Sequence, residues 1–335
     1  MKKVFDTLSI GNSGKGRSPV SDNGALQVRI ALQGGGGLGA YEAGVLQVLD
    51  ENPMIDVVEG TGLSAGATNL YALKYGGSVG LGNVWNKVGE VGDLAGVMNK
   101  IASFTVLPQL LGPTYARVLQ GAGVMPTTLD YIRNILDKST DTDNPACPNM
   151  KMHITTAQKV DSECGLEIEN VREVIHSGYD LDLDVVMASC ALEELASYER
   201  GGVVTIDGEA HWDGAYSGNN PSLSMFENKD KTPLIIISVD DTEVRASAED
   251  PNIVYGRIHD DVVALRDKVK APVYHIALEH GDGIGDHLRH QPSSDGVAAL
   301  MEAGRRDAQE CLLEIEHDLG INLMQEIEEE EPAVV

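Results

Sequence analysis

Four glycines in a row, residues 34–37, end an apolar run and precede a helical pattern. Glycine loses more backbone freedom on folding than any other residue, so such a run is kept where the backbone turns sharply or comes close to a ligand. The preceding residues 28–33 have the length of a short buried strand. The apolar residues that follow recur at helical spacing, at Tyr41, Val45, Val48 and Leu49. The order strand, glycine loop, helix predicts that the loop is a binding element.

A second apolar run, residues 57–61, leads into Gly62-Leu63-Ser64-Ala65-Gly66, which fits the G-x-S-x-G pattern. In this pattern a sharp turn between a strand and a helix projects the serine hydroxyl, and small residues on either side let the backbones approach. A helical run, residues 67–75, follows. Ser64 is therefore expected at a helix N-terminus, where the helix dipole favours developing negative charge. The pattern predicts that Ser64 is a nucleophile.

The remainder of the chain alternates predicted strands with predicted helices. We expect strands at residues 153–156, 166–169, 233–239 and 272–278, and a long amphipathic helix at residues 297–315. Thr127 and Asp130 resemble a capping box that opens a further helix. This alternation is typical of a layered α/β/α fold with a central, largely parallel sheet. Ligands bind such sheets at the carboxyl ends of the strands, where the glycine loop and Ser64 are both expected.

The motifs span most of the chain, so we expect one domain and not two. Residues 26–325 form the predicted domain, residues 1–25 a flexible arm rich in Ser, Gly and Asn, and residues 326–335 an acidic tail. Residues 101–126 are apolar, contain three prolines and have no clear period. They are either a packed connection or a lid that meets an apolar substrate.

The chain is strongly acidic, with 25 Lys and Arg against 52 Asp and Glu and a formal net charge of -27. This balance argues against nucleic acid, or a strongly anionic membrane, as the main partner. At most transient contact with membranes is expected. The acidity fits either an ordinary hydrated surface or adaptation to high salt.

The four cysteines are widely spaced and include no C-x-x-C pair, so neither a zinc site nor a disulfide framework is predicted. The N-terminal apolar run is too short for a signal peptide, and no segment reaches the ~20 apolar residues of a membrane span. We expect a cytoplasmic protein with free thiols. These patterns do not specify an oligomeric state.

A nucleophilic serine needs a base, and histidine is the usual one. None of the nine histidines stands out: three fall in expected strands and three in a polar loop, namely His153, His211, His275 and His280, His287, His290. The segment HWDGAYSGNNP offers a carboxylate instead. In it Asp213 is followed by Gly214, which permits an unusual backbone, and by further turn residues. Taken alone, an Asp-Gly pair is only a common turn signal.

Taken together, the motifs resemble the patatin-like phospholipases, whose pattern joins a glycine-rich oxyanion loop G-G-G-x-[RK]-G, a G-x-S-x-G serine and a D-G-[GA] aspartate followed by N-x-P. Here these elements are GGGGLG at residues 34–39, GLSAG at 62–66, and DGA at 213–215 with Asn219 and Pro221. The stretch ASCAL at residues 188–192 is similar to the family as well. The resemblance covers roughly residues 27–240.

The resemblance implies a layered α/β hydrolase with a Ser-Asp dyad and with no cofactor or metal ion. Asp213 then accepts the proton of Ser64, the serine attacks an ester carbonyl, and water hydrolyses the acyl-enzyme. A buried carboxylate can act as this base because burial raises its pKa towards neutrality. The implied substrates are acyl esters of lipids, of lysolipids or of small molecules.

The resemblance also assigns roles to the glycines. The N–H groups of Gly35, Gly36 and Gly37 are expected to bind the oxyanion. The glycines expected to support the motifs are Gly34, Gly39, Gly62, Gly66 and Gly214. One residue departs from the pattern, because Leu38 stands where many members carry Arg or Lys. This change is expected to remove a cation near the oxyanion, so that backbone N–H groups and the helix dipole stabilise it alone.

Two other functions fit parts of the sequence. Gly34, Gly36 and Gly39 satisfy the G-x-G-x-x-G pattern of a dinucleotide-binding oxidoreductase, with Glu59 about 20 positions further on as the acid that binds the ribose. This hypothesis leaves GLSAG and the aspartate motif unexplained. A non-catalytic lipid-binding protein of the same fold is the second alternative, and the intact serine and aspartate count against it.

Overall fold

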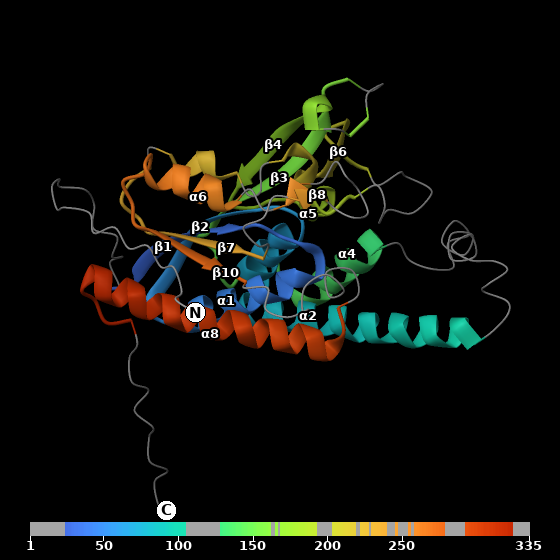
Figure 1. The fold of residues 1–335 in the computed structure, drawn as a ribbon, viewed down its shortest axis with the longest axis horizontal. Helices are drawn as coiled ribbons and strands as arrows, with labels where there is room; N and C mark the ends of the chain where they lie inside the picture. Colours follow the sequence, from blue (N-terminus) through green and yellow to red (C-terminus); the bar gives the residue numbers. More distant parts are fainter. Residues whose placement is uncertain are drawn as a thin grey trace, which may run out of the picture.

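A central sheet organises the part of the chain that the computed structural model describes (Figure 1). The described residues are 24–104, 128–161, 165–166, 168–192, 203–218, 222–227, 229–239, 245–246, 254–255, 258–278 and 292–323. Several sequence expectations lie outside these residues: the N-terminal arm up to residue 23, the acidic tail, most of residues 101–126, and His280, His287 and His290.

The sheet has eight strands in the order β10-β7-β1-β2-β3-β6-β5, with β4 also paired to β3. They are β1 (Leu26–Leu32), β2 (Ile55–Gly62), β3 (Lys151–Lys159), β4 (Val171–Gly178), β5 (Val204–Ile206), β6 (Glu209–Asp213), β7 (Leu234–Ser238) and β10 (Val273–Ala277). A separate pair is formed by β8 (Arg245–Ala246) and β9 (Val254–Tyr255). Pairing is parallel from β10 to β3, and antiparallel where β3 meets β4 and β6 and where β5 meets β6. The predicted α/β fold with a largely parallel sheet is confirmed.

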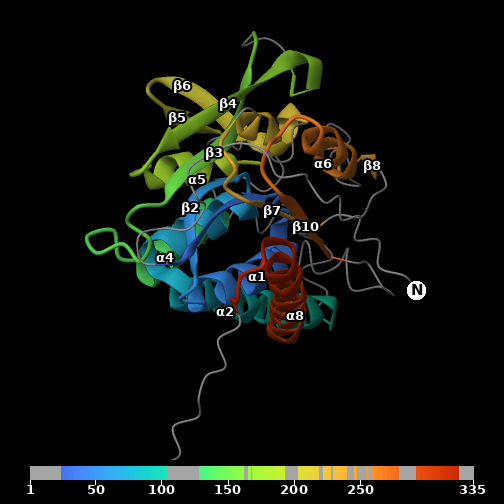
Figure 2. The same ribbon diagram turned by 90° about the vertical axis from the view of Figure 1, so that its left-hand side faces the viewer.

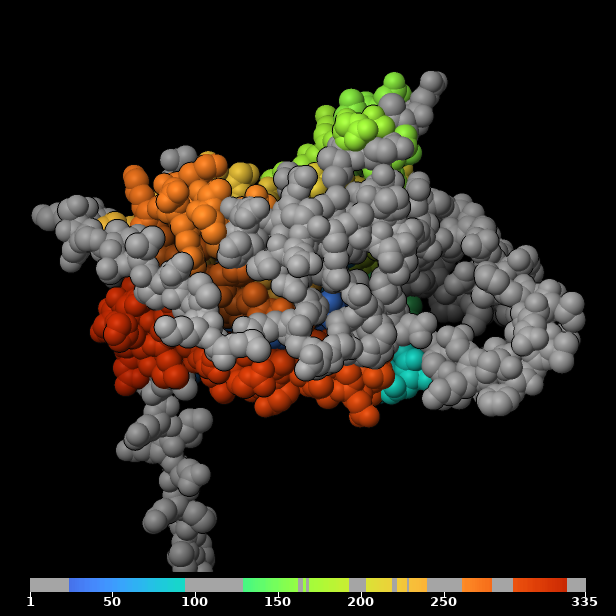
Figure 3. Space-filling model, viewed as in Figure 1, coloured from blue at the N-terminus to red at the C-terminus, as the bar shows by residue number. Residues whose placement is uncertain are grey.

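Helices cover both faces of the sheet (Figure 2). On one face lie α1 (Gly39–Glu51), α2 (Ala65–Phe104) and α8 (Ser294–Leu319), and on the other α6 (Ile258–Arg266) with the short 3-10 helix η4 (Leu223–Phe226). Apolar side chains of the central strands are buried on both faces, as expected for parallel strands between two layers. The main core draws its residues from Leu26 to Leu323. In the space-filling view α8 forms the lower edge of the molecule and α6 lies above it (Figure 3).

Two glycines let α1 and α8 cross at very short range. A Cβ at Gly44 would lie 2.0 Å from the carbonyl oxygen of Met301, and a Cβ at Gly304 would lie 2.1 Å from that of Tyr41. The Tyr41 hydroxyl donates a hydrogen bond of 2.8 Å to Asp307 Oδ2 across the same contact. Helix α8 therefore fixes the position of α1, which carries the glycine loop at its N-terminus.

Substitution Gly304→Ala is expected to lower the free energy of unfolding by about 2–3 kcal/mol, because the new methyl group meets backbone that cannot move aside. Chemical denaturation measures this loss. Gly82→Ala in α2 is the matched control, since its Cβ would meet only the movable end of the Gln47 side chain, at 3.2 Å. Helix propensity favours this control by up to about 1 kcal/mol. Equal stabilities of the two variants would contradict the proposed close contact.

Strand β3 joins the two halves of the sheet. Gly62 at the end of β2 pairs with Ile154 of β3, and two positions further along β3 Thr156 pairs with Asp213 at the end of β6. Strand β4 runs along the opposite edge of β3. The ends of β2 and β6 are therefore neighbours on one edge of β3.

One local expectation is wrong. The described residues of the expected strand at 166–169 are not in a strand: the 3-10 helix η2 (Ile168–Asn170) begins there and β4 follows it. An alternation over four residues does not distinguish a strand from a turn. The helix expected at residues 67–75 is confirmed as part of α2, which has 40 residues and is interrupted by the non-helical Gly77 (φ 59°). Helix α4 (Thr128–Ser139) appears where a capped helix is expected, although Thr127 itself lies outside the described residues. Within the described part of the chain, no helix is both long and apolar enough to cross a membrane.

Candidate active site

Ser64 occupies the turn between β2 and α2. Its φ of 52° lies in the left-handed region, which a residue with a side chain rarely adopts. The flanking glycines make the turn possible: a Cβ at Gly62 would lie 2.8 Å from the carbonyl carbon of Gly66, and one at Gly66 would lie 2.8 Å from the carbonyl oxygen of Leu32. The turn therefore has the tight geometry that the G-x-S-x-G pattern requires, and the Ser64 side chain is half-buried.

Three side chains hold the strained backbone of Ser64. Its N–H donates to Ser189 Oγ (2.9 Å), and the Ser189 hydroxyl in turn donates to the carbonyl oxygen of Thr155 on β3 (2.7 Å). The Cys190 thiol and the Thr68 hydroxyl both donate to the Ser64 carbonyl oxygen, at 3.3 and 3.4 Å. Ser189 ends α5 (Leu183–Ser189), within the ASCAL stretch, so that stretch contributes contacts which the sequence pattern did not assign.

Asp213 is the last residue of β6 and the cap of the 3-10 helix η3 (Gly214–Ser217). Its side chain is almost completely buried, and Oδ1 accepts the N–H of Ala215 at 2.9 Å. Oδ2 has no hydrogen bond of ordinary geometry to any described residue. Gly214 is required beside it, because a Cβ there would lie 2.6 Å from the carbonyl oxygen of Thr155.

The electrostatics of Asp213 follow from this burial. Loss of hydration raises the pKa of the carboxyl group from 3.8 to about 7, although the Ala215 N–H and the Ser64 hydroxyl favour the ionised form. The influence of the hydroxyl places Ser64 beside the carboxyl group. The predicted nucleophile and the predicted base, 149 positions apart in the sequence (213 minus 64), are thus brought together.

The glycine loop lies against the serine turn. Gly34, Gly35 and Gly36 have φ values of 80°, 138° and 58°, which suit only glycine. A Cβ at Gly34 would lie 2.4 Å from the Leu63 carbonyl oxygen, so only glycine permits this approach of loop to turn. The loop continues into η1 (Gly36–Leu38), which leads directly into α1.

The loop also carries backbone donors that the fold does not use. The first hydrogen bonds of η1 are donated by Leu38 and Gly39. The N–H groups of Gly35, Gly36 and Gly37 come earlier and have no partner among the described residues. Unused N–H groups before a helix form a site for an anion, as a developing oxyanion would be.

A buried polar network ties the loop to α1 and α2. Glu42 accepts the Gly34 N–H at Oε1 (2.7 Å) and the Asn69 amide at Oε2 (3.0 Å). Asn69 also donates to the Gly39 carbonyl oxygen (2.9 Å) and accepts the Trp85 indole N–H at Oδ1 (2.7 Å). The sequence patterns did not predict these residues. The available signal was Glu42 itself, because a carboxylate on the buried face of a helix must accept hydrogen bonds from buried donors.

Substitution Glu42→Gln is expected to disturb the hydrogen bonds of this network, because Gln has the size of Glu but replaces one carboxylate oxygen by an NH₂ donor. Gln can still accept the Gly34 N–H, but its amide then faces the amide of Asn69, donor against donor. Rotation of the Asn69 amide by 180° would break its hydrogen bonds with the Trp85 indole N–H and with the Gly39 carbonyl oxygen. Complete loss of one oxyanion donor costs ~10²–10³ in kcat. The variant should only displace such a donor, so we expect kcat for ester hydrolysis to fall less, about tenfold, with KM little changed.

Steady-state kinetics on a chromogenic ester checks the Glu42 prediction. Glu51→Gln is the matched control, since Glu51 is exposed at the other end of α1 and contacts Arg305. Full activity in Glu42→Gln, with full stability, would show that the network does not position the loop.

Leu38 has a packing role that the sequence motif does not indicate. Its side chain is completely buried and belongs to the main core. The replacement of Arg or Lys by Leu therefore contributes to packing, and an apolar side chain is what this site can bury without a partner.

Glu59 does not occupy the position that a dinucleotide site requires. It lies within β2, three residues before the end of the strand, and its carboxylate contacts Arg29, His153 and Lys229. A ribose-binding acid lies at the end of its strand with its oxygens available. The described residues also include no group of three or more His, Cys, Asp or Glu side chains that could hold a metal ion.

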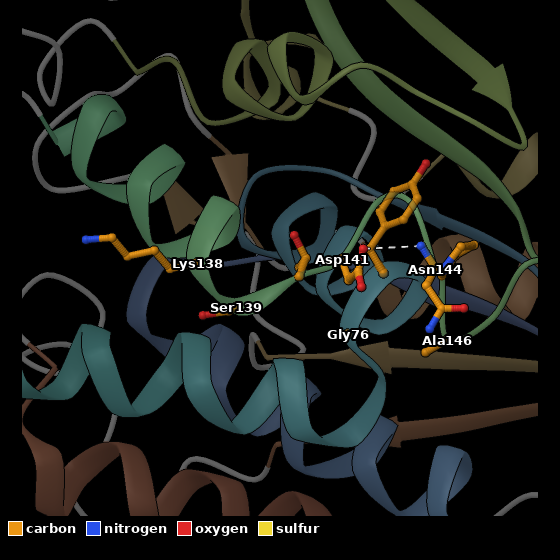
Figure 4. Close-up of a pocket in the computed structure, with 9 residues that line it drawn as sticks. Gly76, Lys138, Ser139, Asp141, Asn144 and Ala146 are labelled. Carbon is orange, nitrogen blue, oxygen red and sulfur yellow. Dashed lines mark hydrogen bonds between the residues drawn. The ribbon is translucent and has the colours of Figure 1, made fainter.

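A separate cavity of about 470 Å³ lies between α2 and the loop that follows α4 (Figure 4). Tyr75, Lys138 and Asp141 are among the residues that line it, and the Asn144 N–H donates to Asp141 Oδ1 at 3.2 Å. Tyr75 is eleven positions along α2 from Ser64, roughly 16 Å at the rise of a helix. The cavity is therefore not part of the candidate active site.

Comparison with known proteins gives remote structural similarity. No family model matches the sequence, and neither does any curated protein. Among solved structures, ExoU in the ExoU-SpcU complex of the type III secretion system of Pseudomonas aeruginosa is similar, with a TM-score of 0.38 and 14% identity over 94% of this chain and 60% of that chain. VipD from Legionella pneumophila has a TM-score of 0.33 and 12% identity over 86% of this chain and 69% of that chain. The present chain thus spans about 60% of the length of the ExoU chain.

Proposed function

We propose that this protein is a serine acyl-ester hydrolase in which Ser64 is the nucleophile and Asp213 the general base. The observation that carries the proposal is the buried carboxyl group of Asp213, whose Oδ2 has no hydrogen-bond partner among the described residues and whose pKa is lowered by the Ser64 hydroxyl. A pKa of about 7 makes this carboxylate a base suited to proton transfer near neutral pH.

The proposed reaction has two halves. The proton of Ser64 Oγ moves to Asp213 while Oγ bonds to the ester carbonyl carbon, and the oxyanion accepts hydrogen bonds from Gly35, Gly36 and Gly37. The tetrahedral intermediate expels the alcohol, which takes the proton from Asp213. Water then repeats the sequence on the acyl-enzyme and releases the carboxylic acid. No cofactor or metal ion enters either half.

The proposed reaction does not need a histidine base, and no histidine of the described residues forms a hydrogen bond with Ser64. His211 is two residues before Asp213, but its Nδ1 faces Thr156 Oγ1 and its Nε2 faces the Gln158 amide, each at 2.8 Å. Burial, with help from His176 and Arg172, lowers the pKa of His211 to about 4. It therefore stays neutral and holds β6 against β3, which supports the position of Asp213.

We further propose that residues 26–325 form one catalytic domain, which is supported by a main core that runs from Leu26 to Leu323. Acyl esters of lipids, lysolipids or small molecules are the proposed substrates. The net charge of -27 favours a zwitterionic or uncharged ester over an anionic bilayer. A cytoplasmic location stays a prediction from the sequence.

Hydrolysis of p-nitrophenyl octanoate and of a lysophosphatidylcholine, with salt varied, tests the proposed function. We expect Ser64→Ala to lower kcat by about 10³ or more, because the nucleophile is removed. Ser224→Ala is the matched control, since Ser224 is exposed on η4, and it should keep full activity. Equal turnover by wild type and Ser64→Ala would overturn the assignment. A wild type that binds these lipids without turnover would favour the non-catalytic alternative.

A further inference from the structure

A second serine is held by a buried histidine and a carboxylate, away from the candidate active site. Ser177 Oγ lies 2.6 Å from His153 Nδ1, and His153 Nε2 lies 2.8 Å from Glu59 Oε1. His153 and Glu59 are only 3% and 8% exposed, whereas Ser177 is exposed. Ser177 therefore lies at the surface, while its two partners are shielded from water.

Strand register explains why these side chains meet. His153 of β3 is directly opposite Ser177 of β4 on one side and Thr61 of β2 on the other. Glu59 is two residues before Thr61, so it shares a sheet face with both and lies diagonally across from His153. Met152 and Ile154, the neighbours of His153, point into the main core on the opposite face. Glu59 and Ser64 are five positions apart along the chain, roughly 16 Å in an extended strand.

The partners of Glu59 fix which nitrogen of His153 carries the proton. Burial opposes ionisation of Glu59, but the hydrogen bonds from His153 and Lys229 outweigh it and hold its pKa at about 2. Arg29 Nε donates to the other oxygen at 2.9 Å. An ionised carboxylate only accepts hydrogen bonds, so His153 Nε2 must be the donor. In the neutral imidazole Nδ1 is then the bare nitrogen, and it accepts the Ser177 hydroxyl.

This order of contacts is the one that activates serine in acyl transfer: hydroxyl to imidazole, and imidazole to a carboxylate that sets the tautomer. Here the carboxylate also binds two cations, Arg29 and Lys229 Nζ (2.6 Å). Their charges reduce the stabilisation that Glu59 can give to an imidazolium. Activation is therefore partial, and only an electrophile with a good leaving group should react.

We propose that Ser177 is a second reactive serine, independent of Ser64, which takes small activated esters and fluorophosphonates. The proton of Ser177 Oγ moves to His153 Nδ1 as Oγ bonds to the carbonyl carbon or the phosphorus. The bond to p-nitrophenolate or fluoride breaks, and the leaving group departs with the electron pair. The proton passes from His153 to solvent, and the serine keeps the acyl or phosphonyl group.

The test uses the folded Ser64→Ala protein, so that its outcome does not depend on the proposed function. The protein is treated with a biotin-linked fluorophosphonate, and peptide mass spectrometry follows the labelling of individual serines with time. We expect Ser177 to be labelled at least tenfold faster than Ser224, an exposed serine in the same molecule and with no imidazole partner among the described residues.

Two further variants test whether the label is on Ser177 and whether its rate depends on His153. Ser64→Ala/Ser177→Ala should lose this label. It also removes the hydrogen bond to His153 Nδ1, so cooperative thermal unfolding is checked beside the labelling. Adding His153→Gln to Ser64→Ala should slow the labelling of Ser177 to the rate of Ser224 in molecules that unfold cooperatively. Equal labelling of Ser177 and Ser224 in Ser64→Ala itself would overturn the proposal, whatever the His153 variant does.

Discussion

Replacement of Asp213 by Asn is expected to lower kcat about 10³-fold and, at the same time, to make the folded protein more stable at alkaline pH. The loss of activity follows because Asn cannot accept the serine proton, and general bases contribute ~10²–10⁴ in rate. Asn keeps the size of Asp and can still accept the Ala215 N–H that now reaches Oδ1. The local backbone should therefore be preserved.

The gain in stability follows from the raised pKa of Asp213. Below pH 3.8 the carboxyl group is neutral in both the folded and the unfolded chain, so it imposes no cost. As the pH rises to about 7 the unfolded chain ionises first, and the folded state loses stability relative to it. A shift from 3.8 to about 7 corresponds to about 4 kcal/mol when complete. Asn carries no charge and avoids this cost.

Urea denaturation of wild type and Asp213→Asn across the pH range measures this effect. Between about pH 5 and pH 8 the stability difference should change by about 3 kcal/mol in favour of the variant. The change with pH isolates the carboxyl group, because any fixed cost of the Asn amide is the same at each pH. Wild-type activity should rise over the same range as Asp213 ionises. A stability difference that does not vary with pH would mean that Asp213 is not buried in its ionised form.

Substitution Gly34→Ala is expected to separate the glycine loop from the serine turn. The added methyl group would lie 2.4 Å from the Leu63 carbonyl oxygen, in a backbone with φ of 80°. Overpacking of this kind costs about 1–3 kcal/mol, and the left-handed conformation adds about 1–2 kcal/mol. Because the loop carries the proposed oxyanion donors, kcat should fall ~10²-fold or more.

Gly24→Ala distinguishes the two causes in the Gly34 experiment. Gly24 has a similar φ of 88°, yet a Cβ there would meet no atom within 4 Å. Gly24→Ala should lose only the stability that the left-handed backbone costs an alanine, and its activity should be unchanged. Comparison of kcat and of urea midpoints for the two variants then gives the cost of the contact itself. Similar losses of activity in both would contradict a role for the contact between loop and turn.

The sequence predicts the elements around the candidate site well, because they depend on local patterns. Strands β1, β2 and β7 and helix α8 are confirmed, since apolar runs and helical periods extend over enough residues to be distinguished. The expected strand at residues 166–169 failed because four residues carry too little of a pattern. The assignment of Ser64 and Asp213 to catalysis stays a prediction until it is measured.

The contacts that hold the site could not be predicted in the same way. Ser189 reaches the Ser64 N–H across 125 positions, and Glu42 meets Asn69 across 27. No local spacing encodes such pairs, because the sheet order and the crossing of α1 with α2 create them. Leu38 shows the converse: its place in a motif suggests the active site, whereas its burial belongs to the core.

The pairing of β2 and β6 with strand β3 fixes the spacing between the two candidate catalytic residues. Strand β2, which ends near Ser64, pairs with β3 at Ile154, and β6, which ends at Asp213, pairs with β3 at Thr156. Two residues of one strand therefore set the distance between the proposed nucleophile and base. The segment between β3 and β6 adds contacts at both ends, since Ser189 accepts the Ser64 N–H and the Asp213 N–H donates to the Ala191 carbonyl oxygen. A slip of a single residue in the pairing of β6 with β3 would therefore move Asp213 by about 3.3 Å and turn its side chain to the wrong face of the sheet.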